Sequence, residues 1–93
     1  MPEFEHFFTT QADCDFQAFF ERYGDRFYHL VDRAIGQIAE FPESAPIYAG
    51  SVRRLILPKT PLGLFYGIHG NRIAIIAILD LRQNPAEIER RLN

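Results

Sequence analysis

The sequence predicts a single α+β domain over residues 1–93, with an N-terminal helical hairpin packed on an antiparallel sheet of three to four strands and a short C-terminal helix. Two amphipathic helical patterns fill the first half of the chain. Three strand patterns fill the second half, and the last two are joined by a tight-turn signal. A chain of 93 residues, 47% of them apolar, is long enough for one hydrophobic core and too short for two.

The first helix is predicted over residues 11–23. Its apolar side chains recur at helical spacing: Ala12, Phe16, Phe19, Phe20 and Tyr23. Thr10, followed three residues later by Asp13, has the form of a capping box, and Gly24 is the expected end.

The second helix is predicted over residues 25–41. Its broad apolar stripe consists of Phe27, Leu30, Val31, Ala34, Ile35 and Ile38. Pro42 stops it. Because the joint between the two helices is so short, we expect them to form an antiparallel hairpin. Residues 40–51, EFPESAPIYAGS, are rich in Pro, Ser and Gly and are interpreted as a loop.

Strand patterns follow at residues 52–58, 62–69 and 72–81, and Gly70 with Asn71 indicates a tight hairpin between the last two. These segments are expected to form an antiparallel meander. A weaker first strand is possible at residues 3–8. Residues 85–92 indicate a short terminal helix with Pro85 in its first turn.

The last strand is apolar on both faces. Strict alternation puts Ile73, Ile75, Ala77 and Leu79 on one face, and Ala74, Ile76 and Ile78 on the other. The helical hairpin can cover one face, but the terminal helix offers only Ile88 and Leu92 to the second. We therefore expect an exposed apolar groove, and such grooves usually mark a partner site.

The net charge of −2 conceals an asymmetry between the halves of the chain. Residues 1–46 hold nine acids and three arginines, net −6, whereas residues 47–93 hold seven bases and three acids, net +4. The seven bases are Arg53, Arg54, Lys59, Arg72, Arg82, Arg90 and Arg91. If they share one sheet, they create a local positive field, and a polyanion or an acidic partner becomes plausible.

Several classes of protein are disfavoured. The single Cys14 cannot form an internal bridge, the N-terminus lacks the basic start and apolar run of a signal peptide, and no segment has the length of a membrane span. A cytoplasmic protein without membrane contact is expected. The three histidines, His6, His29 and His69, lack ligand spacing, so no metal is expected. No other cofactor is expected either.

The sequence resembles the ParE-like branch of the RelE/ParE toxin superfamily. The resemblance rests on the order and spacing of short motifs over about two-thirds of the chain. These are Ile38 with residues 41–43 (FPE), Arg53 and Arg54, Phe65 and Tyr66, residues 73–79, and Arg82 with Pro85. The fold of that family, two helices on an antiparallel sheet, agrees with the periodicity described above.

The resemblance implies the toxin of a type II toxin–antitoxin system, of the kind known as plasmid stabilisation proteins. Such a toxin inhibits growth and is neutralised by a cognate antitoxin, with which it can form a hetero-oligomer. In the family, the antitoxin tail wraps along the sheet and the helical hairpin. The antitoxin-binding candidates are Ile73, Ile75, Ile76 and Ile78, and the seven bases of the C-terminal half are the target-binding candidates.

Two targets remain open. RelE-like members cleave messenger RNA on the ribosome with a cluster of basic residues. In this sequence Gly63 stands at the position where those members have an arginine. The C-terminal tail also lacks the tyrosine or histidine that they have there. The catalytic candidates left are Arg82, Arg54, Lys59 and Tyr66, the last only if its hydroxyl meets Arg82. ParE-like members inhibit DNA gyrase without known catalytic residues, and these departures favour that class. A non-toxic binding module of the same fold is the third alternative.

Overall fold

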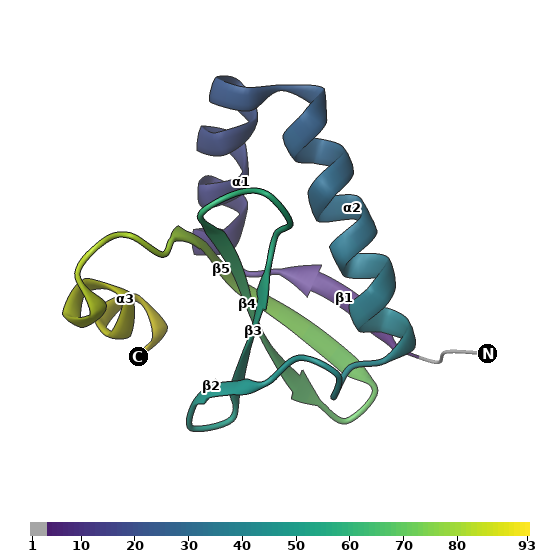
Figure 1. Cartoon of the computed structure of the whole chain (residues 1–93). Helices are drawn as coiled ribbons and strands as arrows, with labels where there is room; N and C mark the ends of the chain where they lie inside the picture. Colours follow the sequence, from purple (N-terminus) through teal and green to yellow (C-terminus); the bar gives the residue numbers. More distant parts are fainter. Residues whose placement is uncertain (1–3) are drawn as a thin grey trace.

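A computed structural model describes residues 4–93 and contains three helices and one mixed sheet (Figure 1). Along the chain the elements are β1 (Glu5–Phe8), α1 (Thr10–Tyr23), α2 (Asp25–Glu40), β2 (Ile47–Ala49), β3 (Val52–Ile56), β4 (Leu62–His69), β5 (Arg72–Asp80) and α3 (Pro85–Leu92). The predicted α+β class, helical hairpin and terminal helix are confirmed.

The sheet is larger than predicted, with five strands in the order β1-β5-β4-β3-β2. β2, β3, β4 and β5 form the expected antiparallel part, but β1 runs parallel to β5 at one edge. The segment interpreted as a loop contributes the three-residue strand β2 at the other edge. The predicted start of the first strand, Glu3, lies outside the described residues.

The helical hairpin is set by local signals. The N-cap of α1 is Thr9, one residue before the predicted cap, and its hydroxyl accepts a hydrogen bond from the Ala12 amide at 3.2 Å. Gly24 separates the two helices with a φ of +69°, a conformation that favours glycine. The buried residues of α2 lie on one stripe: Phe27, Val31, Ala34 and Ile38. Both helices therefore pack on the same face of the sheet (Figure 1).

A β-bulge at Ile76 changes the faces of β5. Phe65 pairs with Ala77, but the next residue, Tyr66, pairs with Ile75, so Ile76 is the extra residue of β5. Because the extra residue shifts the alternation, Ile78 faces the helices together with Ile73 and Ile75. Ala77 and Leu79 face away from them. The strict alternation expected from the sequence was wrong at this point.

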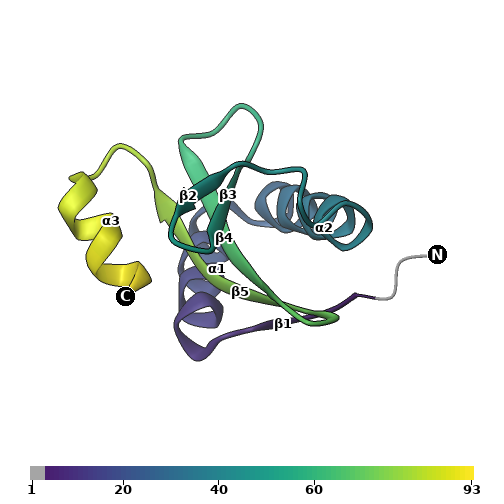
Figure 2. The same ribbon diagram turned by 90° about the horizontal axis from the view of Figure 1, so that it is seen from below.

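The two faces of the sheet carry two separate cores. The larger core lies between the sheet and α1 and α2, and includes Leu64, Tyr66, Ile73, Ile75 and Ile78, all 0% exposed. The smaller core lies on the opposite face, where α3 packs Ile88 against Phe65, Ala77 and Leu79. Figure 2 shows α3 on the opposite side of the molecule from α2.

None of the helices in residues 4–93 combines the length and apolar character needed to cross a membrane.

Candidate functional site

The sheet face opposite α1 and α2 is the candidate functional site, because α3 covers only one end of it. We call the remainder the open sheet face. It is made by Phe7, Tyr48, Arg54, Gly67, His69, Arg72, Ala74 and Ile76. Five strands contribute to it, so residues far apart in the sequence become neighbours only in the fold.

Small residues form the centre of this face, and larger side chains stand around them. Gly67 pairs with Ala74, and Ala74 pairs on its other side with Phe7. A Cβ at Gly67 would lie 3.3 Å from Nε2 of His69 and 3.7 Å from Cδ1 of Ile76, so both side chains lean over the glycine. A ligand can therefore approach the backbone at the centre of the face once these two side chains move aside.

Two arginines of the face lie over aromatic rings. The guanidinium carbon of Arg54 is 5.0 Å from the ring centroid of Tyr48, and that of Arg72 is 4.4 Å from the centroid of Phe7. Stacking holds a guanidinium in place while leaving its N–H groups free for a ligand. Nε of Arg54 is buried without a hydrogen-bond partner among residues 4–93. An acceptor supplied by a partner would remove that deficit.

Arg53, a predicted target-binding residue, lies on the other face of the sheet and has a structural role. Its Nη1 donates hydrogen bonds to the carbonyl oxygens of Glu43 at 3.0 Å and Ala45 at 2.7 Å. The two neighbouring arginines thus point to opposite faces, as alternation along a strand requires. Arg53 anchors the segment between α2 and β2, so it adds no charge to the open sheet face.

Tyr66, a catalytic candidate, has a similar structural role. It is fully buried on the helix side, and its hydroxyl donates a hydrogen bond of 2.6 Å to the carbonyl oxygen of Pro42. The hydroxyl does not meet Arg82, which was the condition for a site role. Burial raises the pKa of Tyr66, and the charge of Arg53 only partly offsets this effect. The hydroxyl is therefore a neutral donor at neutral pH.

Arg82 follows β5 and is engaged by Asp80. Its Nε and Nη2 donate to the two carboxylate oxygens at 3.0 and 2.7 Å, and its main-chain amide donates to Oδ1 at 2.9 Å. These hydrogen bonds lower the pKa of Asp80 to about 2. The pair is largely exposed, so Arg82 can exchange this partner for another at modest cost.

The remaining predicted cations do not join the open sheet face. Lys59 lies in the turn between β3 and β4, beside the junction of α1 and α2. Arg90 pairs with Glu87 on the exposed side of α3, whereas Arg91 reaches α1 and binds Asp15 through both oxygens at 2.8 and 3.2 Å. Of the seven bases, only Arg54 and Arg72 belong to the open sheet face, so the expectation of one basic patch was wrong.

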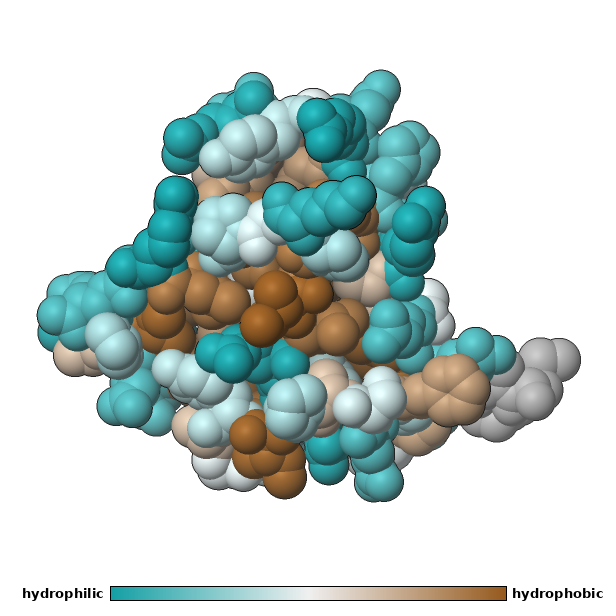
Figure 3. All heavy atoms as spheres, in the orientation of Figure 1, coloured by the Kyte–Doolittle hydropathy of each residue, from teal (hydrophilic) through white to brown (hydrophobic). Residues whose placement is uncertain are grey.

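The predicted apolar groove is also smaller than expected. Ile73, Ile75 and Ile78 are 0% exposed beneath the helices, so their side chains are not open to a partner in this conformation. Ile76 alone of the four isoleucines is partly exposed, because the bulge turns it to the open sheet face. Elsewhere, Figure 3 shows apolar surface near the middle of the view, below the helical hairpin, where Figure 1 places β3. Ile56 of β3 is 51% exposed.

Sequence reasoning missed Tyr48 and Phe7 as parts of the site. Tyr48 lies in β2, which was interpreted as loop, and Phe7 lies in the weakly predicted first strand. Neither residue stands in a segment with alternating polar neighbours, since Tyr48 lies between Ile47 and Ala49 and Phe7 is followed by Phe8. Their pairing partners depend on the register of the whole sheet.

Comparisons with known proteins support the fold. No family model matches the sequence, and no curated protein matches it. A solved structure described as "Chromosomal ParDE TA system from P. aeruginosa" contains a chain with the same architecture, at a TM-score of 0.64 and 18% sequence identity. The superposition covers 88% of this chain and 100% of that chain.

This chain has a RelE/ParE-like fold. In this fold the helical hairpin covers one face of the sheet, and the open sheet face described above lies on the other. The RelE/ParE-like architecture therefore presents Arg54 and Arg72 on a surface that α1 and α2 do not cover.

Proposed function

We propose that this chain is the toxin of a type II toxin–antitoxin system, of the ParE-like kind. It inhibits growth by binding an intracellular target such as DNA gyrase, and a cognate antitoxin neutralises it. The observation that carries the proposal is the likeness over 88% of the chain to a chain of a ParDE system. The sequence resemblance, which rests on different evidence, points to the same family.

Binding rather than catalysis is favoured by the contacts of the catalytic candidates. Tyr66 is engaged by Pro42 on the buried face, and Arg82 is engaged by Asp80. Lys59 lies in a turn next to the helices. Arg54 is the one catalytic candidate on the open sheet face, and a nucleolytic site needs a base and an acid together with positive charge.

The target and the antitoxin are proposed to use the open sheet face. Arg54 and Arg72 supply positive charge, and Tyr48 and Ile76 supply apolar contact area. An acidic, amphipathic antitoxin tail complements both features. Neutralisation then follows from competition, because antitoxin and target contact the same arginines.

A RelE-like, ribosome-dependent messenger RNA endonuclease is the second candidate. The same face presents His69 next to Gly67, and Arg54 stacked on Tyr48, which are groups that can bind an RNA backbone and its bases. Unlike Arg82, Arg54 has no carboxylate partner within 4.0 Å among residues 4–93.

One experiment separates these functions. The chain is expressed alone from a tightly repressed promoter, viable counts are followed, and the purified protein is assayed for inhibition of gyrase supercoiling and for ribosome-dependent messenger RNA cleavage. We expect growth arrest and inhibited supercoiling without cleavage. The double variant Arg54→Gln/Arg72→Gln should weaken both effects by roughly tenfold. Arg90→Gln, on the exposed side of α3, is the matched control and should change neither.

Two other outcomes would support the alternative functions. Cleavage that is lost in Arg54→Gln would establish the nuclease. Normal growth on induction, with the protein folded and abundant, would support a binding module without toxicity.

A further inference from the structure

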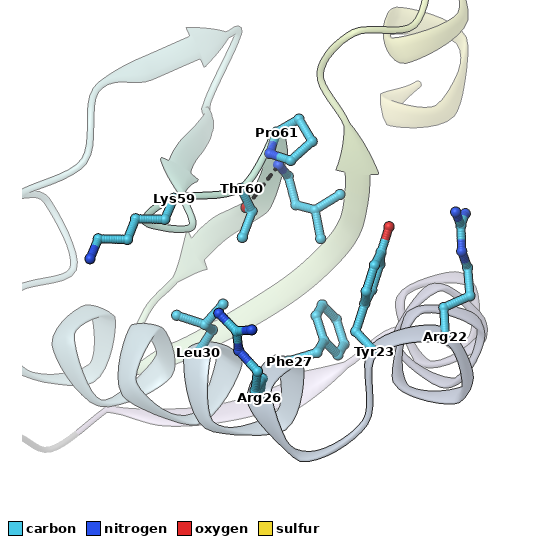
Figure 4. A pocket seen from close by; sticks show the side chains of 9 residues that line it. Arg22, Tyr23, Arg26, Phe27, Leu30, Lys59, Thr60 and Pro61 are labelled. Carbon is cyan, nitrogen blue, oxygen red and sulfur yellow. Dashed lines mark hydrogen bonds between the residues drawn. The ribbon is translucent and has the colours of Figure 1, made fainter.

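A cavity separate from the open sheet face lies where the hairpin of α1 and α2 meets the turn between β3 and β4 (Figure 4). Its volume is about 380 Å³, which is within the range of binding pockets. Phe27 and Leu62 form its floor and are 2% and 3% exposed, and Leu30 and Pro61 add to the apolar lining. The cavity can therefore receive a large apolar side chain.

Three cations from three elements surround this cavity: Arg22 at the end of α1, Arg26 in the first turns of α2, and Lys59 in the turn. Within residues 4–93, none of them has a carboxylate within 4.0 Å. Figure 4 shows Arg26 rising from α2 toward the turn, with Lys59 at one end of the cavity and Arg22 beside Tyr23 at the other. The charges are spaced along the cavity, which suits an extended ligand with several anionic groups.

The turn that carries Lys59 is well ordered by its own hydrogen bonds. The Thr60 hydroxyl donates to the carbonyl oxygen of Leu57 at 2.8 Å and accepts from the amide of Leu62 at 3.0 Å. Lys59 has a φ of +62°, in the left-handed region. A side chain in that region costs about 1–2 kcal/mol, which glycine would avoid. The turn therefore fixes the backbone from which the Lys59 side chain extends beside the cavity.

The apolar floor distinguishes the ligand class. Phe27 and Leu62 suit a buried apolar side chain and not a nucleic-acid backbone, which carries a charge at every phosphate. A peptide can instead place its few carboxylates opposite the cations and leave the other positions neutral. The carboxylate of Asp80 hydrogen-bonds Arg82, and the charge of Arg22 also acts on it, so Asp80 partly offsets the charge of Arg22.

We propose that this cavity binds an acidic peptide segment of a partner protein. A large apolar side chain of the segment seats against Phe27 and Leu62, and its flanking carboxylates contact Arg26, Lys59 and Arg22. The site uses no residue of the open sheet face and goes beyond the proposed function, because it assigns a second partner contact at another place on the molecule.

The test uses short fluorescent peptides and the full chain, with binding followed by fluorescence anisotropy at low and high salt. The main probe has one central phenylalanine flanked by glutamates. Two matched peptides replace the glutamates by glutamine or the phenylalanine by alanine. We expect saturable binding of the main probe, weakened by salt and weakened by roughly tenfold in each matched peptide.

Protein variants locate the site. Arg26→Gln/Lys59→Gln should weaken binding by roughly tenfold, and Arg33→Gln, an exposed arginine of α2 outside the cavity, should leave it within about twofold. All three positions are exposed, so circular dichroism should show unchanged folding. Equal binding of the glutamine peptide, or equal affinity in the double variant, would refute the proposal. So would tighter binding of a single-stranded oligonucleotide, or no binding of the main probe up to about 1 mM. Growth arrest is not measured, so this outcome is separable from that of the proposed function.

Discussion

At the scale of single residues, neighbours in the sequence have different roles because the sheet points them in opposite directions. Arg53 binds two carbonyl groups on the helix side, whereas Arg54 lies over Tyr48 on the open sheet face. Tyr66 joins β4 to the end of α2 through Pro42. Substitutions at these positions therefore separate folding from binding.

Removing the Tyr66 hydroxyl should destabilise the fold without affecting the open sheet face. Tyr66→Phe keeps the packed ring and leaves the carbonyl oxygen of Pro42 without this donor. We expect the free energy of unfolding to fall by about 1–2 kcal/mol. Urea denaturation measures this change. An unchanged free energy of unfolding would show that water satisfies the Pro42 carbonyl equally well.

The carboxyl of Asp80 should titrate with a pKa of about 2, below its ordinary value of 3.8, because Arg82 donates hydrogen bonds to it. Since the folded-state pKa is depressed, the stabilisation is present above the ordinary pKa and is lost as the pH falls from about 4 toward 2. Carboxyl ¹³C NMR measures the titration. In Arg82→Gln the midpoint should move back toward the ordinary value. A midpoint near 4 in the wild-type chain would contradict the bidentate contact.

At the scale of elements, α3 is held by few contacts. Ile88 packs on the smaller core, and Arg91 binds Asp15 of α1, whose Oδ2 also accepts a hydrogen bond of 3.1 Å from the Ile78 amide. Asp15 thus links α1, β5 and α3. Its side chain is 13% exposed, so this ion pair is better shielded from water than the pair of Arg90 with Glu87.

Two adjacent arginines of α3 make a matched comparison. Arg91→Met should lower the free energy of unfolding by about 1–2 kcal/mol, because it leaves the largely buried Asp15 with the Ile78 amide as its remaining partner. Arg90→Met removes an exposed pair and should change it by less than about 0.5 kcal/mol. Chemical denaturation of both variants gives the comparison. Equal effects would mean that Arg91 does not hold α3 to α1.

At the scale of the whole molecule, stability should be uneven, because the two cores differ in size. The larger core joins α1 and α2 to the sheet, and the smaller core joins α3 to one end of the opposite face. Small units with few buried contacts open more readily than the rest of a domain.

Amide hydrogen exchange should show this difference. We expect the slowest exchange in β4 and β5, which pair with each other along their whole length, and the fastest helical exchange in α3. NMR or mass spectrometry can follow the exchange by segment. Protection of α3 equal to that of β5 would indicate one cooperative unit in place of two.

The sequence by itself determined most of the elements. The bounds of α3 and β4 agree with the predictions, and α1 and α2 differ from theirs by one residue at one end, since caps, glycines, prolines and hydrophobic period are local properties. The class of fold followed from their order. The site was predicted only in part, because Arg54, Arg72 and Ile76 belong to the open sheet face and the other candidates of the C-terminal half do not.

Only the tertiary structure decided which way the β5 side chains face and which cations share a surface. The bulge at Ile76 exists because β5 carries one more residue than β4 between their paired ends, and it moved Ile78 into the core. The parallel pairing of β1 brought Phe7 beside Arg72 across 65 positions of the chain. Register between strands is a non-local property, set by packing of the whole sheet, so no segment read alone contains it.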